Sequence, residues 1–387
     1  MKKFLALAMA GSMAFSLAAC GGNSASSSSA AGATSSATAE EATTSEITGI
    51  AQVCDVGTID DESFNQGCWE AVEAFGEANG IAVEYYLPSD DNDEERQTLI
   101  RNAINDGANT VVCVGYLYGP ALAWASEEYP DVNFIGVDMT AADIGTETIP
   151  ENVYCITYKE EQAGYLAGYA AVKDGFTELG FLGGMAVPAV IRYGYGFVQG
   201  ADAAAQEMGA NIHINYWYGG AFSGDANITA KMESWYSGGT QVVFACGGGI
   251  YTSAVEAAVK YDGKVIGVDV DQNYIGEQDV ESGKYSYNPF VTSAMKGLNE
   301  GVTDALDHVM NGTWSNIAGT NGVYGLQEGD YVGLPTAEGS WNFSTFTVEE
   351  YEAVKEQIRS GEIVVDDSSD DTVKPTVSES TTVDYQV

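Results

Sequence analysis

The amino-acid sequence predicts an α/β protein in which helices cover two parallel β-sheets. Three observations predict this class. Short apolar segments alternate with segments of helical periodicity between residues 47 and 365. Segments such as 110–114 are continuous β-branched runs, as expected of parallel strands buried on both faces. The number of strand–helix units suits two sheets better than one very wide sheet.

The first half of the chain shows this alternation from residue 47 onward. A strand is predicted at 47–53, and a helix follows it. Ser63 is a suitable N-cap for this helix, which carries Trp69 and Phe75 at helical spacing. The remaining elements of this half are, in order, a strand at 82–87, a helix at 90–106, a strand at 110–114, a helix at 121–129 and a strand at 133–137.

The second half repeats the alternation. Its predicted elements are a helix at 160–172, a strand at 178–182, a helix at 193–208, a strand at 212–218, a helix at 226–237, a strand at 241–245, a helix at 251–261 and a strand at 264–268. Strands separated by helices are typical of parallel sheets. Each sheet then presents the carboxyl ends of its strands to a crevice, where ligands of such folds bind.

Polar residues and glycines follow these strands. In chain order they are Asp55, Gly115-Tyr116, Asp138, 219–225, Gly247-Gly248-Gly249 and Asp269. Taken singly, each is weak evidence, because an aspartate after a strand is often a turn former or helix cap. The three glycines also lack the lysine of a phosphate-binding loop. Their accumulation at equivalent strand ends predicts a ligand site there.

Composition excludes some functions and leaves others open. The chain has 15 Lys and Arg against 56 Asp and Glu, a net charge of −41, which would repel nucleic acid. An enzyme would need a nucleophile–base pair or a metal cluster, but the only histidines are His213 and His308. Adjacent carboxylates such as Asp60-Asp61 could act as acid and base, although they suit a capping loop better. We therefore expect no enzyme activity and no cofactor.

The cysteines after residue 20 do not indicate a metal site. Their spacing matches no zinc pattern, and most lie in apolar runs typical of buried strands. A disulfide among them stays open. The five are Cys54, Cys68, Cys113, Cys155 and Cys246.

The two ends of the chain differ in composition from the middle. Lys2 and Lys3 precede an apolar segment that closes on small residues before Cys20, which predicts a signal peptide at 1–19. Leu-Ala-Ala-Cys resembles a bacterial lipobox, so Cys20 is the expected lipidation site. An ordinary signal peptide with an incidental cysteine is the alternative. We expect residues 20–46 to form a Gly/Ser/Ala/Thr-rich flexible linker and residues 366–387 to form a frayed acidic tail.

The segment 55–66, Asp-Val-Gly-Thr-Ile-Asp-Asp-Glu-Ser-Phe-Asn-Gln, resembles the opening signature of the basic membrane protein (BMP, or PnrA-like) family. These are substrate-binding lipoproteins whose best-described branch binds purine nucleosides. The resemblance covers residues 47–365 in matching order and spacing. Further matches are Glu160 to Gly168, Gly196 to Gly200, Tyr218 to Phe222, Ile266 to Gln272, Thr292 to Lys296 and Ile358 to Ile363.

The resemblance implies a type I periplasmic-binding-protein fold with two doubly wound parallel-sheet lobes joined by three crossings. The crossings are expected near Thr157, Phe290 and Gly319. Lobe 1 would then comprise 47–156 plus 290–318, and lobe 2 157–289 plus 319–365. Such a protein delivers its solute to the permease and ATPase subunits of an ABC importer. We expect a monomer tethered to the extracytoplasmic face of the cell membrane.

The resemblance also implies a set of ligand-binding residues. Phe64 and Phe222 match the two rings that sandwich a base, and Asp138 matches the reader of its polar edge. The ribose hydroxyls would be held by the residues matched by Asp269, Lys296 and Gly248. Asp55 and Asn65 match further pocket positions. These residue types suit a flat base and a vicinal diol, because rings stack on bases and charged groups form the stronger hydrogen bonds.

The ligand is less well determined than the fold. The sequence departs from the family pattern at Thr58, Glu62 and Ile250-Tyr251, and the segment 284–290 is rich in tyrosine. Guanosine, inosine and adenosine are the expected ligands. A sugar or another small solute is the alternative, as is a surface receptor that does not transport, because aromatic rings and carboxylates also suit sugars.

Overall fold

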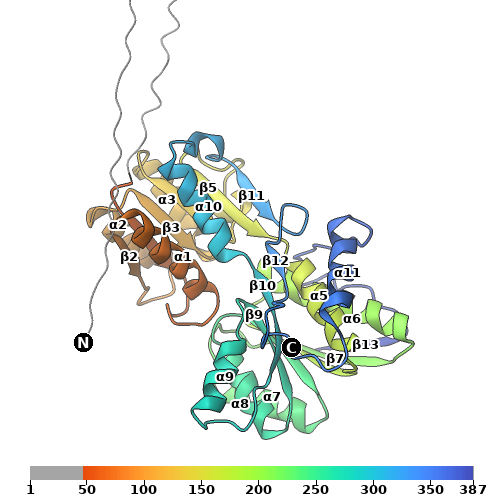
Figure 1. Ribbon diagram of the computed structural model, residues 1–387. Coiled ribbons are helices and arrows are strands. Elements are labelled where there is room, and N and C mark those ends of the chain that lie inside the picture. The colour runs from red at the N-terminus through yellow and green to blue at the C-terminus, as the bar shows by residue number, and fades with distance from the viewer. Residues whose placement is uncertain (1–46, 387) are drawn as a thin grey trace, which may run out of the picture. The chain divides into compact units, whose positions relative to one another are not determined.

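The computed structural model describes residues 47–386, which contain two β-sheets flanked by helices (Figure 1). The predicted signal peptide at 1–19, the lipidation site Cys20 and the linker at 20–46 lie outside the described residues. Within 47–386, no helix combines the length and apolarity that a bilayer span requires.

The first sheet has six parallel strands in the order β11-β5-β4-β3-β1-β2. They are β1 (Ile50–Cys54), β2 (Val83–Tyr86), β3 (Thr110–Val114), β4 (Asn133–Val137), β5 (Val153–Tyr158) and β11 (Asn321–Tyr324). Figure 1 shows β11 beside β5, although the two are far apart in the chain. The flanking helices are α1 (Phe64–Asn79), α2 (Asp93–Asn105), α3 (Gly119–Glu128) and α10 (Leu298–Met310).

The central strands of this sheet serve two cores. Val112 and Ile135 belong to the core beneath α1 and α10, whereas Val111 and Phe134 belong to the core beneath α2 and α3. Successive side chains of a strand point to opposite faces, so a strand covered by helices on both sides must be apolar at every position. This explains the continuous apolar runs in the sequence.

The second sheet has seven strands in the order β12-β10-β9-β8-β6-β7-β13, and only the pairing of β12 with β10 is antiparallel. They are β6 (Glu178–Gly183), β7 (Ile212–Tyr218), β8 (Val242–Cys246), β9 (Lys264–Asp269), β10 (Phe290–Lys296), β12 (Val332–Gly333) and β13 (Thr381–Tyr385). Its helices are α5 (Glu160–Lys173), α6 (Pro188–Met208), α7 (Ala226–Ser237), α8 (Tyr251–Lys260) and α9 (Asn273–Glu281). Shorter elements are α4 (Ala141–Ile144), η1 (Tyr116–Tyr118) and η2 (Trp314–Asn316), and the last helix is α11 (Val348–Arg359).

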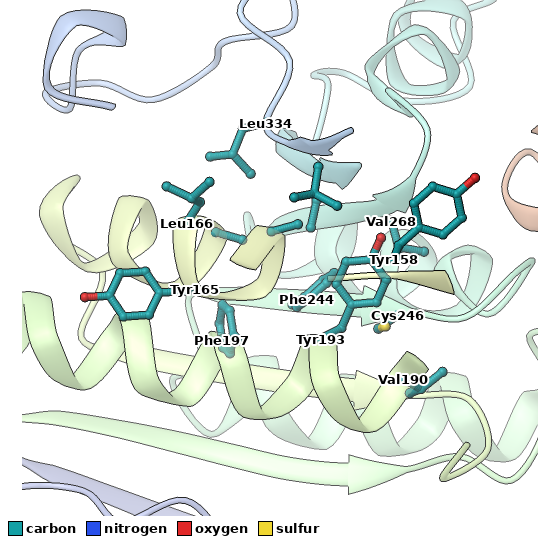
Figure 2. Packing of buried hydrophobic residues seen from close by; sticks show 14 of the residues in the cluster. Tyr158, Tyr165, Leu166, Val190, Tyr193, Phe197, Phe244, Cys246, Val268 and Leu334 are labelled. Carbon is teal, nitrogen blue, oxygen red and sulfur yellow. The ribbon is translucent and has the colours of Figure 1, made fainter. Parts of the chain in front are cut away.

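Helices α5 and α6 pack closely on one face of the second sheet. A Cβ atom at Gly164 or Gly168 of α5 would overlap backbone atoms of α6, including the carbonyl oxygens of Tyr193 and Phe197. Figure 2 shows Phe197 and Tyr193 of α6 beside Phe244 of the sheet. The glycines let the helix backbones approach, and almost every side chain of α5 is buried as a result.

Two of the three crossings between the sheets differ from the expected boundaries. β10 was expected in lobe 1 but pairs with β9 in the second sheet, and β11 was expected in lobe 2 but pairs with β5 in the first. The chain therefore crosses at 158–160, 296–298 and 324–332. The crossing expected near Thr157 agrees with the first of these. The positions expected near Phe290 and Gly319 were wrong, because an apolar strand fits either sheet and only its neighbours decide. We call the first sheet, with its flanking helices and loops, the first lobe. The second sheet, with its flanking helices and loops, is the second lobe.

The three crossings lie against one another. The backbone N–H of Lys159 donates to the carbonyl of Tyr324 at 2.9 Å, and that of Gly297 donates to the carbonyl of Tyr331 at 2.6 Å. The Tyr158 hydroxyl donates to the carbonyl of Gly297 at 2.8 Å. The segments that connect the two lobes are thus joined by hydrogen bonds at one place.

The C-terminal segment 366–386 is ordered, contrary to the expected frayed tail. β13 pairs in parallel with β7 at the edge of the second sheet. The Asp202 carboxylate accepts hydrogen bonds from the backbone and hydroxyl of Ser378, which anchors the approach to this strand. The prediction rested on the acidic composition and overlooked the alternation in this segment, where Thr381 and Val383 are less exposed than Thr382 and Asp384.

Candidate ligand-binding cleft

A cleft of about 610 Å³, which includes a part open to solvent, lies between the strand ends of the two lobes. Its walls come from loops that follow β1, β3 and β4 in the first lobe and β6, β7, β8 and β9 in the second. All eight residues predicted from the sequence line it, namely Asp55, Phe64, Asn65, Asp138, Phe222, Gly248, Asp269 and Lys296.

The cleft adjoins the place in each sheet where the strand order reverses. In the first sheet this place lies between β1 and β3, and there Asp55 meets Gly115. A Cβ atom at Gly115, whose φ is +100°, would overlap the Asp55 carboxylate, so only glycine fits. Burial raises the pKa of Asp55 well above its ordinary value, and Arg96 opposes this shift. Such switch points are the usual ligand sites of open α/β sheets.

The corresponding place in the second sheet lies between β6 and β8 and holds Phe222. A Cβ atom at Gly184 would lie 2.5 Å from a ring carbon of Phe222, and one at Gly247 would lie 2.9 Å away. One at Gly248, where φ is +49°, would lie 2.9 Å from the carbonyl oxygen of Phe222. The glycine run after β8 therefore makes room for an aromatic residue at the cleft.

Asp61 organises the loop that precedes α1. Its carboxylate accepts backbone hydrogen bonds from Ser63 at 3.0 Å, Asn65 at 3.1 Å and Gln66 at 3.1 Å. Burial raises the pKa of Asp61 to about 6, although these bonds oppose the shift. The sequence prediction did not place Asp61 in the cleft, although its position in the loop that follows β1 was an available signal.

Ser63 occupies the N-cap position of α1, as predicted, but its side chain does not cap the helix. Its hydroxyl instead donates to Asp269 Oδ2 at 2.6 Å. Phe64 and Asn65 follow as the first residues of α1 and line the cleft. The Asn65 Oδ1 atom is buried without a hydrogen-bond partner among the described residues, so a ligand donor could bind it.

Asp138 and Asp269 hold equivalent positions in the two lobes. Asp138 follows β4 and Asp269 ends β9, and their φ angles are +59° and +67°. Residues other than glycine rarely adopt this left-handed conformation, and residues held in it cluster at functional sites. Both aspartates thus lie at the carboxyl ends of their strands, where their side chains line the cleft.

Lys296, the last residue of β10, lies among these carboxylates. Its Nζ atom is 2.5 Å from Asp138 Oδ2 and 3.7 Å from both Asp269 Oδ1 and Glu160 Oε1. It also lies over the Phe64 ring, 4.5 Å from the ring centre. The side chain is only 2% exposed. The three carboxylates therefore converge on one ammonium group that bridges the lobes.

The electrostatics of this cluster follow from burial and charge. Burial alone would lower the pKa of the Lys296 ammonium, but Asp138, Asp269 and Glu160 together raise it above its ordinary value. Burial raises the pKa of Asp138 to about 6, and Lys296 opposes that shift. Lys296 is consequently protonated at neutral pH. Among the residues that the structure describes, no group of His, Cys, Asp or Glu could hold a metal ion.

Glu160 completes the cluster and was not singled out from the sequence. It begins α5, is 0% exposed, and its Oε2 atom accepts a 2.7 Å hydrogen bond from Arg192 Nε of α6. Its other oxygen, Oε1, faces Lys296 but makes no hydrogen bond within residues 47–386. A glutamate at a helix start usually complements the helix dipole in solvent, so the sequence offered no signal of burial.

The apolar part of the wall was also missed. It comes from residues 187–190 at the start of α6, together with Tyr193, Cys246 and Val268. Tyr116, one of the strand-end residues expected at the site, also lines the cleft. In the sequence, such residues cannot be distinguished from core residues. The cleft therefore combines aromatic and apolar surface with a few polar groups, which is typical of small-molecule sites.

Comparison with known proteins agrees with this architecture. Residues 49–369 match the family model described as "ABC transporter substrate-binding protein PnrA-like". The chain belongs to this family. The resemblance found in the sequence is thus confirmed, and the family is one of solute-binding proteins rather than enzymes.

Two curated proteins are similar to most of this chain. The "ABC transporter nucleoside-binding protein BmpA" of Lactococcus lactis subsp. cremoris is 29% identical over 299 residues, which are 74% of this chain and 82% of that protein. The "CD4+ T-cell-stimulating antigen" of Listeria monocytogenes is 31% identical over 328 residues, which are 82% of this chain and 87% of that protein.

Solved structures confirm the fold class. A solute-binding protein of an ABC transporter system from Aeropyrum pernix K1 aligns with a TM-score of 0.70 at 20% identity. The alignment covers 84% of this chain and 94% of that chain. The fold is therefore that of the periplasmic-binding-protein-like solute-binding proteins, with two parallel-sheet lobes.

Proposed function

We propose that this ABC transporter substrate-binding protein captures a purine nucleoside in the cleft between its lobes. The observation that carries the proposal is the placement of Phe64 and Phe222. These rings come from opposite lobes and line the same cleft, beside the carboxylates of Asp138 and Asp269. The name of the Lactococcus relative, a nucleoside-binding protein, supports the same ligand class.

The base would lie between the two rings. Stacking of a base on an aromatic ring contributes about 1–3 kcal/mol per base. Asp138 Oδ1 is buried and has no hydrogen-bond partner among the described residues. It can accept a hydrogen bond from a ring N–H or an amino group of a purine. Asp138 would therefore read the polar edge of the base.

The sugar would lie toward Asp269. The Asp269 Oδ2 atom accepts from Ser63, which leaves Oδ1 directed toward Lys296 and the Tyr193 hydroxyl. A vicinal diol can donate to such a carboxylate oxygen and accept from an ammonium group, and both bonds are charge-assisted. Gly248 lies against Phe222 in the loop after β8 and lines the cleft. Because it has no Cβ atom, its backbone could come close to the sugar.

Binding would be coupled to closure of the lobes. Besides the bond between Ser63 and Asp269, the side chain of Gln272 donates to the carbonyl of Glu62 at 2.8 Å, and Tyr274 donates to the Glu62 carboxylate. These contacts join the first lobe to the second. A ligand that contacts both lobes favours the closed arrangement by its differential affinity for that form.

The remaining parts of the proposal concern location and partners. Acylation at Cys20 would anchor the protein to the extracytoplasmic face of the cell membrane, and residues 20–46 would tether it. The closed form would deliver the nucleoside to the permease and ATPase subunits of an importer. We propose that the tethered protein acts as a monomer.

Isothermal titration calorimetry on the purified protein tests the ligand. Guanosine, inosine, adenosine and ribose would be titrated separately. We expect saturable binding of at least one purine nucleoside and much weaker binding of ribose. Binding of ribose or another sugar in preference to every nucleoside would replace the proposal with that of a sugar-binding protein.

A further inference from the structure

Lys296 contacts both groups that would hold the base. Its ammonium group forms a 2.5 Å ion pair with Asp138, the proposed reader of the base edge. The same group lies over the ring of Phe64, 4.5 Å from its centre, where cation–π attraction adds to the ion pair. A base that stacks on Phe64 and donates to Asp138 would compete with these contacts.

We propose that Lys296 determines specificity by making purine binding depend on the attached sugar. The inference rests on the proposed function and deepens it. A base displaces the ammonium group from Asp138, and only a ribosylated base offers that group a hydroxyl in place of the carboxylate it loses. Free purine bases are therefore selected against, although they have the same ring and the same polar edge.

The structure provides a second position for the ammonium group. Glu160 Oε1 and Asp269 Oδ1 each lie 3.7 Å from Nζ, so a short movement of the side chain brings it within hydrogen-bond distance of them. Glu160 Oε1 is buried and makes no hydrogen bond within the described chain. Arg192 fixes the other oxygen of that carboxylate at 2.7 Å, which keeps Oε1 directed at Lys296. Glu160 is thus a positioning residue.

The sugar makes this movement favourable. An ammonium group has three donors, and in a 2% exposed side chain each unsatisfied donor is costly. A ribose hydroxyl near Asp269 accepts from the ammonium group and donates to the carboxylate, so the broken ion pair is replaced. A free base supplies no such hydroxyl, so Glu160 and Asp269 satisfy two donors of the displaced group and the third is left without a partner.

The first experiment compares inosine with hypoxanthine, which share one base. Calorimetry would give the Kd of both ligands for the wild type and for Lys296→Met. We expect the wild type to prefer inosine, and the variant to reduce that preference by about tenfold or more. The matched control is Lys260→Met, which removes an ion pair with Glu233 from a lysine that is 56% exposed. It should leave the preference unchanged.

Lys296→Met leaves three carboxylates without their cation, a change large enough to prevent folding. Crystal structures of the wild type with and without inosine supply a second readout. The Lys296 Nζ atom should be bonded to Asp138 without inosine, and to Glu160, Asp269 or the ribose with it.

The outcomes separate the inference from the proposed function. Absence of binding of every purine nucleoside to the wild type would overturn the proposed function and this inference with it. Binding of inosine with an unchanged preference in Lys296→Met would overturn the inference alone. An ion pair between Lys296 and Asp138 that persists in the inosine complex would do the same.

Discussion

The Ser63 hydroxyl of the first lobe donates a 2.6 Å hydrogen bond to Asp269 Oδ2 of the second lobe. The bond crosses from one wall of the cleft to the other and orients a carboxylate that faces the proposed sugar site. It exists because Asp61, rather than Ser63, accepts the backbone donors at the start of α1. A residue with the sequence features of a helix cap thus serves the contact between the lobes.

We expect Ser63→Ala to weaken nucleoside binding by about tenfold, because a hydrogen bond to a charged group contributes about 1.5–3 kcal/mol. The helix start should be unaffected, since the side chain does not cap it. Calorimetry measures the affinity. Ser282→Ala, which removes an exposed hydroxyl bonded to the carbonyl of Asp279, is the matched control. Equal affinities of Ser63→Ala and wild type would contradict the role given to this bond.

Phe222→Ala should weaken purine nucleoside binding by about tenfold or more, which corresponds to the loss of one stacking face. The ring is partly buried beside Gly184 and Gly247, so the midpoint of unfolding should change little. Calorimetry and thermal unfolding measure the two quantities. Tyr261→Ala, at an exposed tyrosine outside the cleft, is the control. Undiminished affinity of Phe222→Ala would remove Phe222 from the site.

The pH dependence of stability follows from buried carboxyl groups. Burial raises the pKa of Asp61 and of Asp138 to about 6, and that of Glu161 to about 8. A group whose pKa is higher in the folded state than in the unfolded state binds more protons when folded between the two values. Stability therefore increases as the pH falls through this window, and these three groups place the window between about pH 8 and pH 4.

We expect the free energy of unfolding to rise by at least about 1 kcal/mol between pH 8 and pH 5. Partial neutralisation of a chain with a net charge of −41 acts in the same direction, because it reduces self-repulsion. Urea unfolding at pH 8, 7, 6 and 5 measures the effect. A steady loss of stability from pH 8 to pH 5 would show that the shifts have the opposite sign.

Removal of residues 370–387 should destabilise the second lobe without changing ligand affinity. The deletion removes β13, which contributes no residue to the cleft wall, and exposes the outer edge of β7. Exposed edges of this kind pair with other chains. We expect a lower melting temperature and a greater tendency to aggregate, measured by calorimetry and light scattering. A truncated protein as stable as the full chain would show that β13 contributes little.

Much of the fold could be predicted because the local signals agree with the tertiary structure. The segment 212–218 is a strand and 226–237 is a helix, with the bounds that the sequence predicts. The cleft residues could be predicted because loops after parallel strands converge. Asp138 and Asp269 were recognisable as aspartates that follow apolar strands, and the resemblance to a known family gave them roles.

Other features depend on partners distant in the chain. The sequence of β10 does not show which sheet this strand joins. Its pairing with β9 in the second sheet depends on tertiary packing. In the sequence, Glu160 has the features of an exposed residue at a helix start. Its burial depends on Arg192 and Lys296, which are distant in the chain. The pairing of β13 with β7 joins segments more than one hundred and sixty residues apart, and an acidic composition conceals it. Tertiary context, rather than propensity, decides each of these cases.

The most direct test of the account is a crystal structure of the protein with guanosine or inosine bound. The account predicts the base between the rings of Phe64 and Phe222, with its polar edge at Asp138 and its ribose at Asp269 and Lys296. A nucleoside bound outside this cleft, or a base that touches neither ring, would contradict it.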